Sequence, residues 1–406
     1  MIKSTLRAAA VTGAAALLAA GTAGTALAAP GTGTAGSRWT QAELPTGHAT
    51  LLGSAAPDAH TVWAVGATLV DRGPGRTPGF SPVLYAKDTR PGLGSWKTVP
   101  TAKGVPVRMN AVAAVSDRDG WLVGDQGADA AGAGVGGVYT EHWNGRTWSV
   151  QQLALPSATQ SAGLLSVSAV NRSNAWAVGW VQLADPSVPG KPQTSHDEGL
   201  VAHWTGKAWQ RVTLPHVNAD WSLSSITALS PDDVWAVGVG AQGDRSIPLA
   251  LHYDGRSWSV QRDAAFAGFS GSGGLAGVAA HGRNDVWAVG GFRAPGTHST
   301  SALVEHWDGR RWTRITAPAD AGNLTGVAAA PGGIVAVGSS DDDAGDAYGL
   351  RVENGRVASL GLPANTSATE YGPWAVGYYH GLVTVIGALD LAGESLPRPM
   401  VLTGRG

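Results

Sequence analysis

The sequence contains no cysteine, so neither disulfides nor thiol chemistry can contribute to stability or activity. Charged residues make up only 14% of the chain, the formal net charge is −2, and no basic block is present. We therefore expect no nucleic-acid partner and no binding to an anionic membrane surface. Beyond the N-terminal segment, no stretch approaches the roughly 18 apolar residues that a spanning helix needs. Stability must come from packing and from the way the chain closes on itself.

Residues 1–28 have the composition of a secretory signal peptide. Lys3 and Arg7 supply a positive start, a run rich in Ala, Leu and Gly follows, and Ala26-Leu27-Ala28 forms a small-residue cleavage site. A membrane anchor is the alternative, but the run has few strongly apolar residues. We expect a secreted, extracellular chain that begins near Ala29, with residues 29–36 as a short linker and no membrane insertion of the mature form.

One short sequence motif recurs along the rest of the chain, and Val234-Trp235-Ala236-Val237-Gly238 is its typical form. The copies end at seven glycines spaced roughly 50 residues apart, which are Gly66, Gly124, Gly179, Gly238, Gly290, Gly338 and Gly387. A repeat of this period is typical of a protein built from similar structural units. No segment shows a sustained helical period, so each copy is read as a strand.

Two further motifs accompany each copy and complete the unit. Before it stands a short apolar run and a turn cluster, as in Ser225–Asp233, and after it a hairpin sequence, as in His306–Trp312. Asp-Gly or Asn-Gly between aromatic runs indicates a tight hairpin, for which a type I′ turn with positive φ at both central residues is expected. Four antiparallel strands per repeat are typical of a β-propeller blade. A β-solenoid is the alternative, although its coils are usually shorter.

The two ends of the chain complement each other. The C-terminal Thr403-Gly404 breaks off within a hairpin, and the segment Ser37–Pro45 matches the fourth strand of another repeat, Lys207–Pro215. We therefore predict an all-β, seven-bladed propeller over residues 37–406, closed by an N-terminal strand that completes the last blade and leaves no open edge. Trp374-Ala375-Val376-Gly377 suggests an eighth copy, but it lies so close to Gly387 that we assign it to the innermost strand of blade 7.

These motifs together resemble bacterial secreted propellers of the kelch-like and Asp-box (sialidase-like) kinds over nearly the whole chain. The resemblance implies the propeller fold and, less specifically, binding or carbohydrate chemistry. Three departures stand out. Asn144 and Gly145 are adjacent, whereas an Asp-box separates its Asp and Gly. Sialidases use three arginines near the inner strands, where this chain offers only Arg108. Galactose oxidase carries a Tyr–Cys crosslink at copper, which a chain without cysteine cannot form, so a cofactor-dependent sugar oxidoreductase has least support and no cofactor is expected.

Two groups of residues suggest metals at first sight. Four histidines share one repeat position, and we expect each to bond across its own blade rather than to share an ion; they are His142, His203, His252 and His306. The acidic segment Asp341–Asp346 could attract calcium, but its spacing does not fit the 12-residue calcium loop. We interpret it as a solvated loop and assign no metal site, leaving calcium there open.

All but three of the 17 tryptophans fall on repeat positions, where packing between blades accounts for them. The exceptions are Trp180, Trp221 and Trp374. Trp180 is expected to open a long loop of blade 3, and Trp221 to lie in the connection to blade 4, on the same loop-rich face. Together with nearby polar residues they define a predicted ligand-binding patch of Trp180, His196, Asp197, Glu198, His216 and Trp221.

No Ser-centred nucleophile elbow, phosphate loop or zinc motif is present, and no spacing pairs Asp197, Glu198 or Glu370 as acid and base. The sequence therefore favours an exported, monomeric, noncatalytic protein that binds a glycan or protein ligand through its loop-rich face, and we assign no catalytic residue. The alternative is a carbohydrate-active enzyme, a sialidase-like hydrolase or a lyase, acting at the same face. Two carboxylates roughly 5–10 Å apart over the central channel would favour that alternative.

Overall fold

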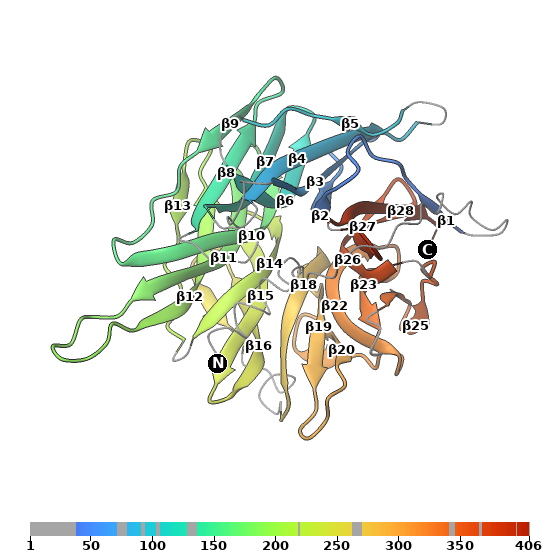
Figure 1. Cartoon of the computed structure of the whole chain (residues 1–406). Coiled ribbons are helices and arrows are strands. Elements are labelled where there is room, and N and C mark those ends of the chain that lie inside the picture. Colours follow the sequence, from blue (N-terminus) through green and yellow to red (C-terminus); the bar gives the residue numbers. More distant parts are fainter. Residues whose placement is uncertain are drawn as a thin grey trace.

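The computed structural model describes residues 38–70, 79–90, 94–102, 106–127, 136–217, 220–261, 270–340, 346–364, 368–394 and 396–405. In these residues the strands form seven four-stranded antiparallel sheets around a central axis (Figure 1). The described part of the chain contains no helix long and apolar enough to cross a membrane. The predicted signal peptide and linker lie outside the described residues.

Each blade runs from an innermost to an outermost strand. Blade 1 comprises β2 (Thr50–Ala55), β3 (Thr61–Val70), β4 (Gly79–Asp88) and β5 (Lys97–Thr98). Blade 2 comprises β6 (Val107–Ser116), β7 (Asp119–Gln126), β8 (Gly137–Trp143) and β9 (Trp148–Gln151). Blade 3 comprises β10 (Thr159–Asn171), β11 (Asn174–Ala184), β12 (Ser195–Trp204) and β13 (Trp209–Arg211). Blade 4 comprises β14 (Trp221–Ser230), β15 (Asp233–Gln242), β16 (Arg245–Tyr253) and β17 (Trp258–Val260).

The remaining blades follow the same order. Blade 5 comprises β18 (Ser272–Gly282), β19 (Asp285–Arg293), β20 (Ser301–Trp307) and β21 (Trp312–Arg314). Blade 6 comprises β22 (Ala321–Ala330), β23 (Gly333–Ser340), β24 (Ala347–Glu353) and β25 (Arg356–Ser359). Blade 7 comprises β26 (Ala368–Tyr379), β27 (Leu382–Leu391), β28 (Arg398–Gly404) and β1 (Trp39–Gln41).

The repeated glycine has a backbone cause. In blade 4, a register shift between Leu223 and Ser225 makes the innermost strand irregular where it faces β15. A Cβ placed on Gly238 would lie 2.0 Å from the carbonyl oxygen of Ser222, so no other residue fits there. A Cβ at the matching glycine of every blade would collide with the innermost strand in the same way. This explains why the repeated motif always ends in Gly.

Three of the four repeat-position histidines hydrogen-bond within their own blades, as expected from the sequence, whereas His142 stacks on Trp121 of its own blade with its Nε2 3.5 Å from Oδ1 of Asp119. His252 stacks on Trp235 with ring centroids 4.1 Å apart, and its Nε2 lies 2.8 Å from Oδ1 of Asp233. His306 repeats the arrangement with Trp287 and Asp285. In blades 2 and 3, burial lowers the pKa of His142 and His203. These side chains therefore tie strands together.

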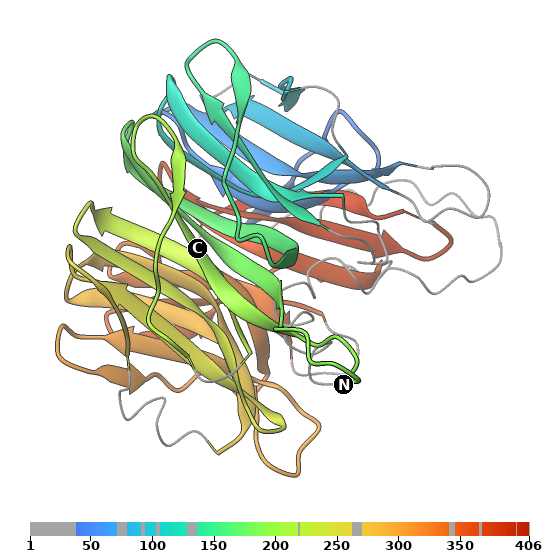
Figure 2. The same cartoon turned by 90° about the vertical axis from the view of Figure 1, so that its left-hand side faces the viewer.

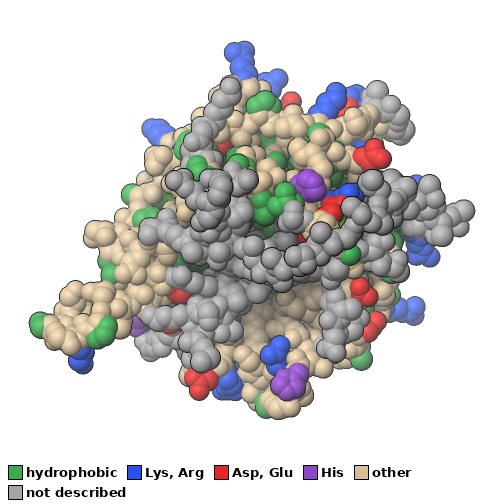
Figure 3. Space-filling model, viewed as in Figure 1, with side chains coloured by type: hydrophobic (Ala, Val, Ile, Leu, Met, Phe, Trp, Pro, Cys, Tyr) green, Lys and Arg blue, Asp and Glu red, His purple; other side chains and the backbone are tan. Residues whose placement is uncertain are grey.

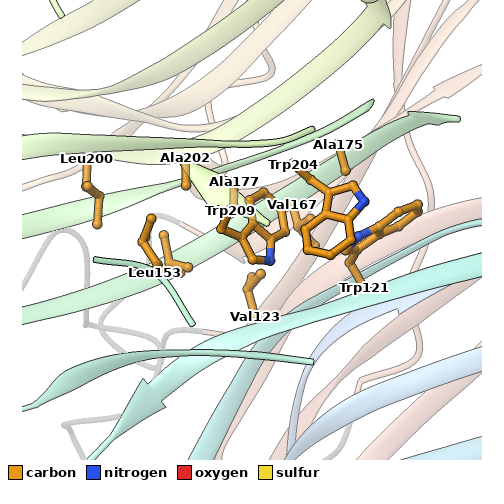
Figure 4. Close-up of a cluster of buried hydrophobic side chains, with 11 residues drawn as sticks. Trp121, Val123, Leu153, Val167, Ala175, Ala177, Leu200, Ala202, Trp204 and Trp209 are labelled. Carbon is orange, nitrogen blue, oxygen red and sulfur yellow. The ribbon is translucent and has the colours of Figure 1, made fainter. Parts of the chain in front are cut away.

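Hydrophobic clusters fill the spaces between neighbouring blades. Between blades 2 and 3, Trp121 and Val123 pack with Trp204 and Trp209, all less than 9% exposed (Figure 4). Leu164 belongs to the same cluster. Figure 2, turned by 90°, shows the blades packed one against the next. Each buried indole removes a large apolar area from water, which makes these interfaces the main stabilising contacts.

The ring closes as the sequence predicts. β1 pairs with β28, with Trp39 opposite Gly404 and Gln41 opposite Leu402. The Trp39 ring is 7% exposed, and its Nε1 donates to the carbonyl oxygen of Leu360 in blade 6 at 3.4 Å. The motif-like segment Trp374-Ala375-Val376-Gly377 lies in β26, so the ring has seven blades and the eight-bladed alternative is excluded.

The outer hairpins differ from the expected type I′ turns. Gly309 has φ +90°, but Asp308 is not among the residues with positive φ. Four residues connect β20 and β21, and Oδ1 of Asp308 accepts the backbone N–H groups of Arg310 and Arg311. That side-chain acceptor stabilises the turn without a second positive φ. Blade 6 does have two adjacent positive-φ residues, Asn354 and Gly355.

The two ends of the ring differ in the connections they carry. One end holds the turns between first and second and between third and fourth strands, which are short except between β4 and β5. The other end, here called the loop-rich face, holds the connections between second and third strands and between blades. Blade 4 departs from this expectation, because only Gly243 and Asp244 separate β15 from β16.

Candidate functional site

Blade 3 contains β10, the longest described strand, and two further long strands that reach the loop-rich face. β10, β11 and β12 contain 13, 11 and 10 residues. Residues 185–194, here called the arm, connect β11 to β12 and project from the ring at the lower left of Figure 1. Figure 3 shows hydrophobic and basic side chains on this projection. Four of the six predicted patch residues lie in the strands β11 and β12 that flank the arm, whereas His216 lies in the connection to blade 4 and Trp221 opens blade 4.

Trp180 lies within β11, opposite Gly163 and Gly199, and not in a loop as the sequence suggested. Its ring is half-buried. A Cβ on Gly163 would lie 3.0 Å from Nε1 of Trp180 and 2.7 Å from Oδ1 of Asp125, a residue of blade 2. The absence of a side chain at Gly163 therefore makes room for the indole beside blade 2.

Trp221 is the first residue of β14 and is 3% exposed. A Cβ on Gly199 would lie 2.2 Å from its ring, so the indole covers the backbone of blade 3. It belongs to the cluster that contains Val178, Val201 and Leu223. The expectation of an exposed ring on a loop is wrong for Trp221, because the glycine in β12 leaves a space that the ring fills.

The three consecutive polar residues of β12 divide between the two faces of the strand. Asp197 is 4% exposed, and its Oδ1 accepts from Nε2 of Gln182 at 3.2 Å. Its backbone N–H donates to Oδ1 of Asp220 at 2.9 Å. His196 and Glu198 lie on the other side of the strand and are partly exposed. Asp197 therefore anchors the blade 3–4 junction, while its two neighbours face solvent.

His196 lies between two carboxylates. Its Nδ1 is 2.6 Å from Oδ1 of Asp185, and its Nε2 is 3.4 Å from Oε1 of Glu198. The hydrogen bond to Asp185, followed by the charges of both carboxylates, raises the pKa of His196 against the opposing effect of burial. Asp185 was not expected from the sequence, since it lies eleven positions earlier and meets His196 only through the hairpin register.

The other predicted residues do not join this group. His216 is exposed in the connection between β13 and β14, and no contact of the described residues links it to His196. The side chain of Glu370 and the acidic residues 341–345 lie outside the described part of the chain. Within the described ranges, no group of three or more His, Asp or Glu side chains is arranged to hold a metal ion.

Sequence reasoning missed a buried polar network at the inner end of blade 2. Arg108 donates to Oδ2 of Asp125 from Nε at 3.0 Å and from its terminal nitrogen at 2.6 Å. Nδ2 of Asn110 donates to Oδ1 of Asp125 at 2.7 Å and to the carbonyl oxygen of Leu164 in blade 3 at 2.8 Å. The guanidinium also lies 5.6 Å from the centre of the Phe80 ring in blade 1. The network thus joins three blades.

The buried carboxyl group of Asp125 finds its hydrogen-bond donors within this network. Burial raises the pKa of its carboxyl group, while Arg108 and then Asn110 oppose that rise. Arg108 and Asp125 are 9% and 5% exposed. The one available signal was Arg108 itself, the single arginine of the inner strands; its partner could not be read from spacing.

Comparison with known proteins supports the fold. No family model and no curated protein matches the chain. Among solved structures, YCF48 bound to D1 peptide is similar at 14% identity and TM-score 0.54, over 91% of this chain and 97% of that chain. Trypanosoma rangeli sialidase with the inhibitor DANA is similar at 11% identity and TM-score 0.45, over 76% of this chain and 56% of that chain. The likeness to YCF48 is one of fold.

Proposed function

We propose that this chain is an exported, noncatalytic binding protein whose loop-rich face takes a polypeptide ligand. The observation that carries the proposal is the pairing of the Arg108 guanidinium with a buried carboxylate. Its guanidinium is paired with the buried Asp125 through two donor nitrogens, so those donors do not reach a substrate carboxylate. The resemblance to sialidases implies inner-strand arginines that bind a substrate carboxylate, whereas Arg108 is part of the scaffold.

The exposed apolar side chains favour a polypeptide over a sugar. In the described ranges, the large hydrophobic residues that are exposed are Val70, Val150 and Val188. None is aromatic, whereas sugar rings are held largely by stacking on aromatic faces. Two of the three valines lie on the loop-rich side, one at the end of β3 and one in the arm. The peptide bound by YCF48, a propeller similar over 97% of its length, supports the same class of ligand.

The arm supplies the contact surface of this proposal. Val188 is 52% exposed, and its carbonyl oxygen accepts the backbone N–H of Lys191 at 3.1 Å, which forms the tip. Pro186, Pro189 and Pro192 restrict the backbone of the same segment. An apolar side chain on a preorganised loop loses little conformational entropy on binding.

The test is a selection of peptides from a displayed random library on the purified chain, followed by calorimetric titration of the selected peptide. Val188→Ser should weaken binding at least about tenfold, which corresponds to about 1.4 kcal/mol. Val150→Ser is the matched control, because Val150 is also exposed, at 40%, but lies on the outermost strand β9. Turnover of fluorogenic sialoside or glycoside substrates by the purified chain would contradict the proposal and favour the enzymatic alternative.

A further inference from the structure

The base of the arm is closed by a histidine between carboxylates on both sides of the hairpin. Asp185 directly follows β11, whereas His196 and Glu198 belong to β12. Nδ1 of His196 is 2.6 Å from Asp185, and Nε2 is 3.4 Å from Glu198. The second oxygen of Asp185 accepts the hydroxyl of Thr194. Asp185 therefore receives bonds from two residues on the returning side of the arm.

The rest of the arm is held by hydrogen bonds that depend on this base. Nε2 of Gln193 donates to the carbonyl oxygen of Asp185 at 2.6 Å, and Oγ of Ser187 donates to Oε1 of Gln193 at 2.8 Å. The backbone N–H of Asp185 donates to the carbonyl oxygen of Thr194 at 3.0 Å. Displacement of Asp185 would disturb each of these bonds, so its position determines the order of the arm.

The charge of His196 decides how many carboxylates it can hold. A neutral imidazole has one N–H and can donate to one carboxylate, whereas an imidazolium donates from both nitrogens. We propose that protonation of His196 locks the arm in its ordered conformation and so controls when the loop-rich face is ready to bind. The consequence for binding rests on the proposed function, whereas the locking of the arm does not.

The charged groups next to His196 all shift its pKa in the same direction. Asp185 and Glu198 both favour the charged ring, and they are the charged groups that raise the pKa of His196 in the described structure. We call the contacts of His196 with Asp185 and Glu198 the clamp. Because the pKa of His196 is higher in the folded than in the unfolded chain, the clamp is complete at pH values below the ordinary histidine range. As the pH rises through the folded value, the ring loses its positive charge and one of its two N–H donors, so its attraction to Asp185 and Glu198 weakens. The arm is therefore held more tightly below the raised pKa of His196 than above it.

The experiment measures amide hydrogen exchange of Asp185 and Lys191 in the full chain at about pH 5.5 and about pH 8.5, corrected for intrinsic exchange. Protection should be about two- to fivefold higher at the lower pH, the size expected for partly exposed ion pairs. His196→Gln should remove this pH dependence, and Glu198→Gln should reduce it. The matched control is the blade 5 hairpin around His298, which is exposed and forms no ion pair in the described structure; His298→Gln should leave the arm unchanged.

A second measurement keeps the test independent of how the variants fold. The His196 ring, titrated by NMR in the unaltered chain, should have a pKa above the ordinary histidine value. A pKa at or below that value, or equal pH dependence of arm exchange in His196→Gln, would overturn the clamp. Neither measurement uses a ligand. A failure here therefore leaves the proposed peptide binding standing, and failed peptide binding leaves the clamp standing.

Discussion

Two buried glutamates at one repeat position should respond in opposite ways to the same substitution. Glu141 and Glu305 directly precede the repeat-position histidines in blades 2 and 5, and both are 0% exposed. Glu305 has a cation, since Nε of Arg314 lies 2.9 Å from its Oε1. Val150 occupies the position opposite Glu141 that Arg314 occupies opposite Glu305. No cation pairs with Glu141 in the described ranges.

Glu141 is satisfied by neutral donors instead. The hydroxyl of Tyr139 donates to its Oε1 at 2.9 Å, and the backbone N–H of Ala102 donates to its Oε2 at 3.0 Å. Burial raises the pKa of Glu141 despite these bonds. The folded state therefore binds the proton more tightly than the unfolded state, and stability falls as the pH rises from the ordinary value of 4.5 through the raised value.

Glu141→Gln should remove that pH-dependent cost. A carboxamide can accept from Ala102 with its oxygen and donate from its nitrogen to the hydroxyl of Tyr139, so both partners stay bonded. We expect the variant to be more stable by about 1 kcal/mol at pH near 8, because it avoids the desolvation of a buried charge, and to match the parent near pH 4. Glu305→Gln should instead lose about 1–2 kcal/mol, because Arg314 loses its counter-charge and is 40% exposed.

The assay is urea unfolding followed by tryptophan fluorescence at both pH values, with Val150→Arg as an additional variant. The introduced arginine should reproduce the Glu305–Arg314 pair and stabilise the parent at pH 8, but not Glu141→Gln. If Glu141→Gln and Glu305→Gln were destabilised alike at both pH values, the reasoning from the missing cation would be refuted.

Three further predictions concern the ring and its turns. Deletion of residues 37–45 should lower stability by more than the about 3–5 kcal/mol of one buried Trp→Ala change, because it also opens the β28 edge; an unchanged melting temperature would refute closure by β1. Gly309→Val should damage folding far more than Asp308→Gly, because only Gly309 has positive φ, at +90°; circular dichroism melts would decide. Trp221→Ala should cost about 3–5 kcal/mol, like Trp287→Ala, whereas Trp180→Ala should cost clearly less because its ring is only half-buried; equal melts of the two would contradict the burial argument.

Much of the fold was predictable because the constraints that produce it act on the backbone and recur. The glycine that ends each repeated motif is required by a carbonyl oxygen of the neighbouring strand, and in blades 3, 4 and 5 the histidine before the outer turn bonds an Asp or Asn of its own blade. Such requirements repeat with the repeat. The closing role of Trp39 was predictable because the N-terminal segment matches an outermost strand.

The candidate site was less predictable, because it depends on side chains that meet once. Trp221 is buried because Gly199 of another blade leaves space for its ring, and Asp185 reaches His196 only through the register of the β11–β12 hairpin. The pairing of Arg108 with Asp125 likewise joins two strands at positions that carry other residues in other blades. Spacing along one chain contains no signal for such contacts.

The most direct test of the central claim is a hydrogen-exchange footprint of the full chain with a library-selected peptide. The account predicts protection on the loop-rich face, concentrated in the arm at residues 185–194 and at the end of β3, with the peptide recovered uncleaved and unmodified. Protection confined to the short turns at the opposite end of the ring, or recovery of a chemically altered peptide, would contradict it.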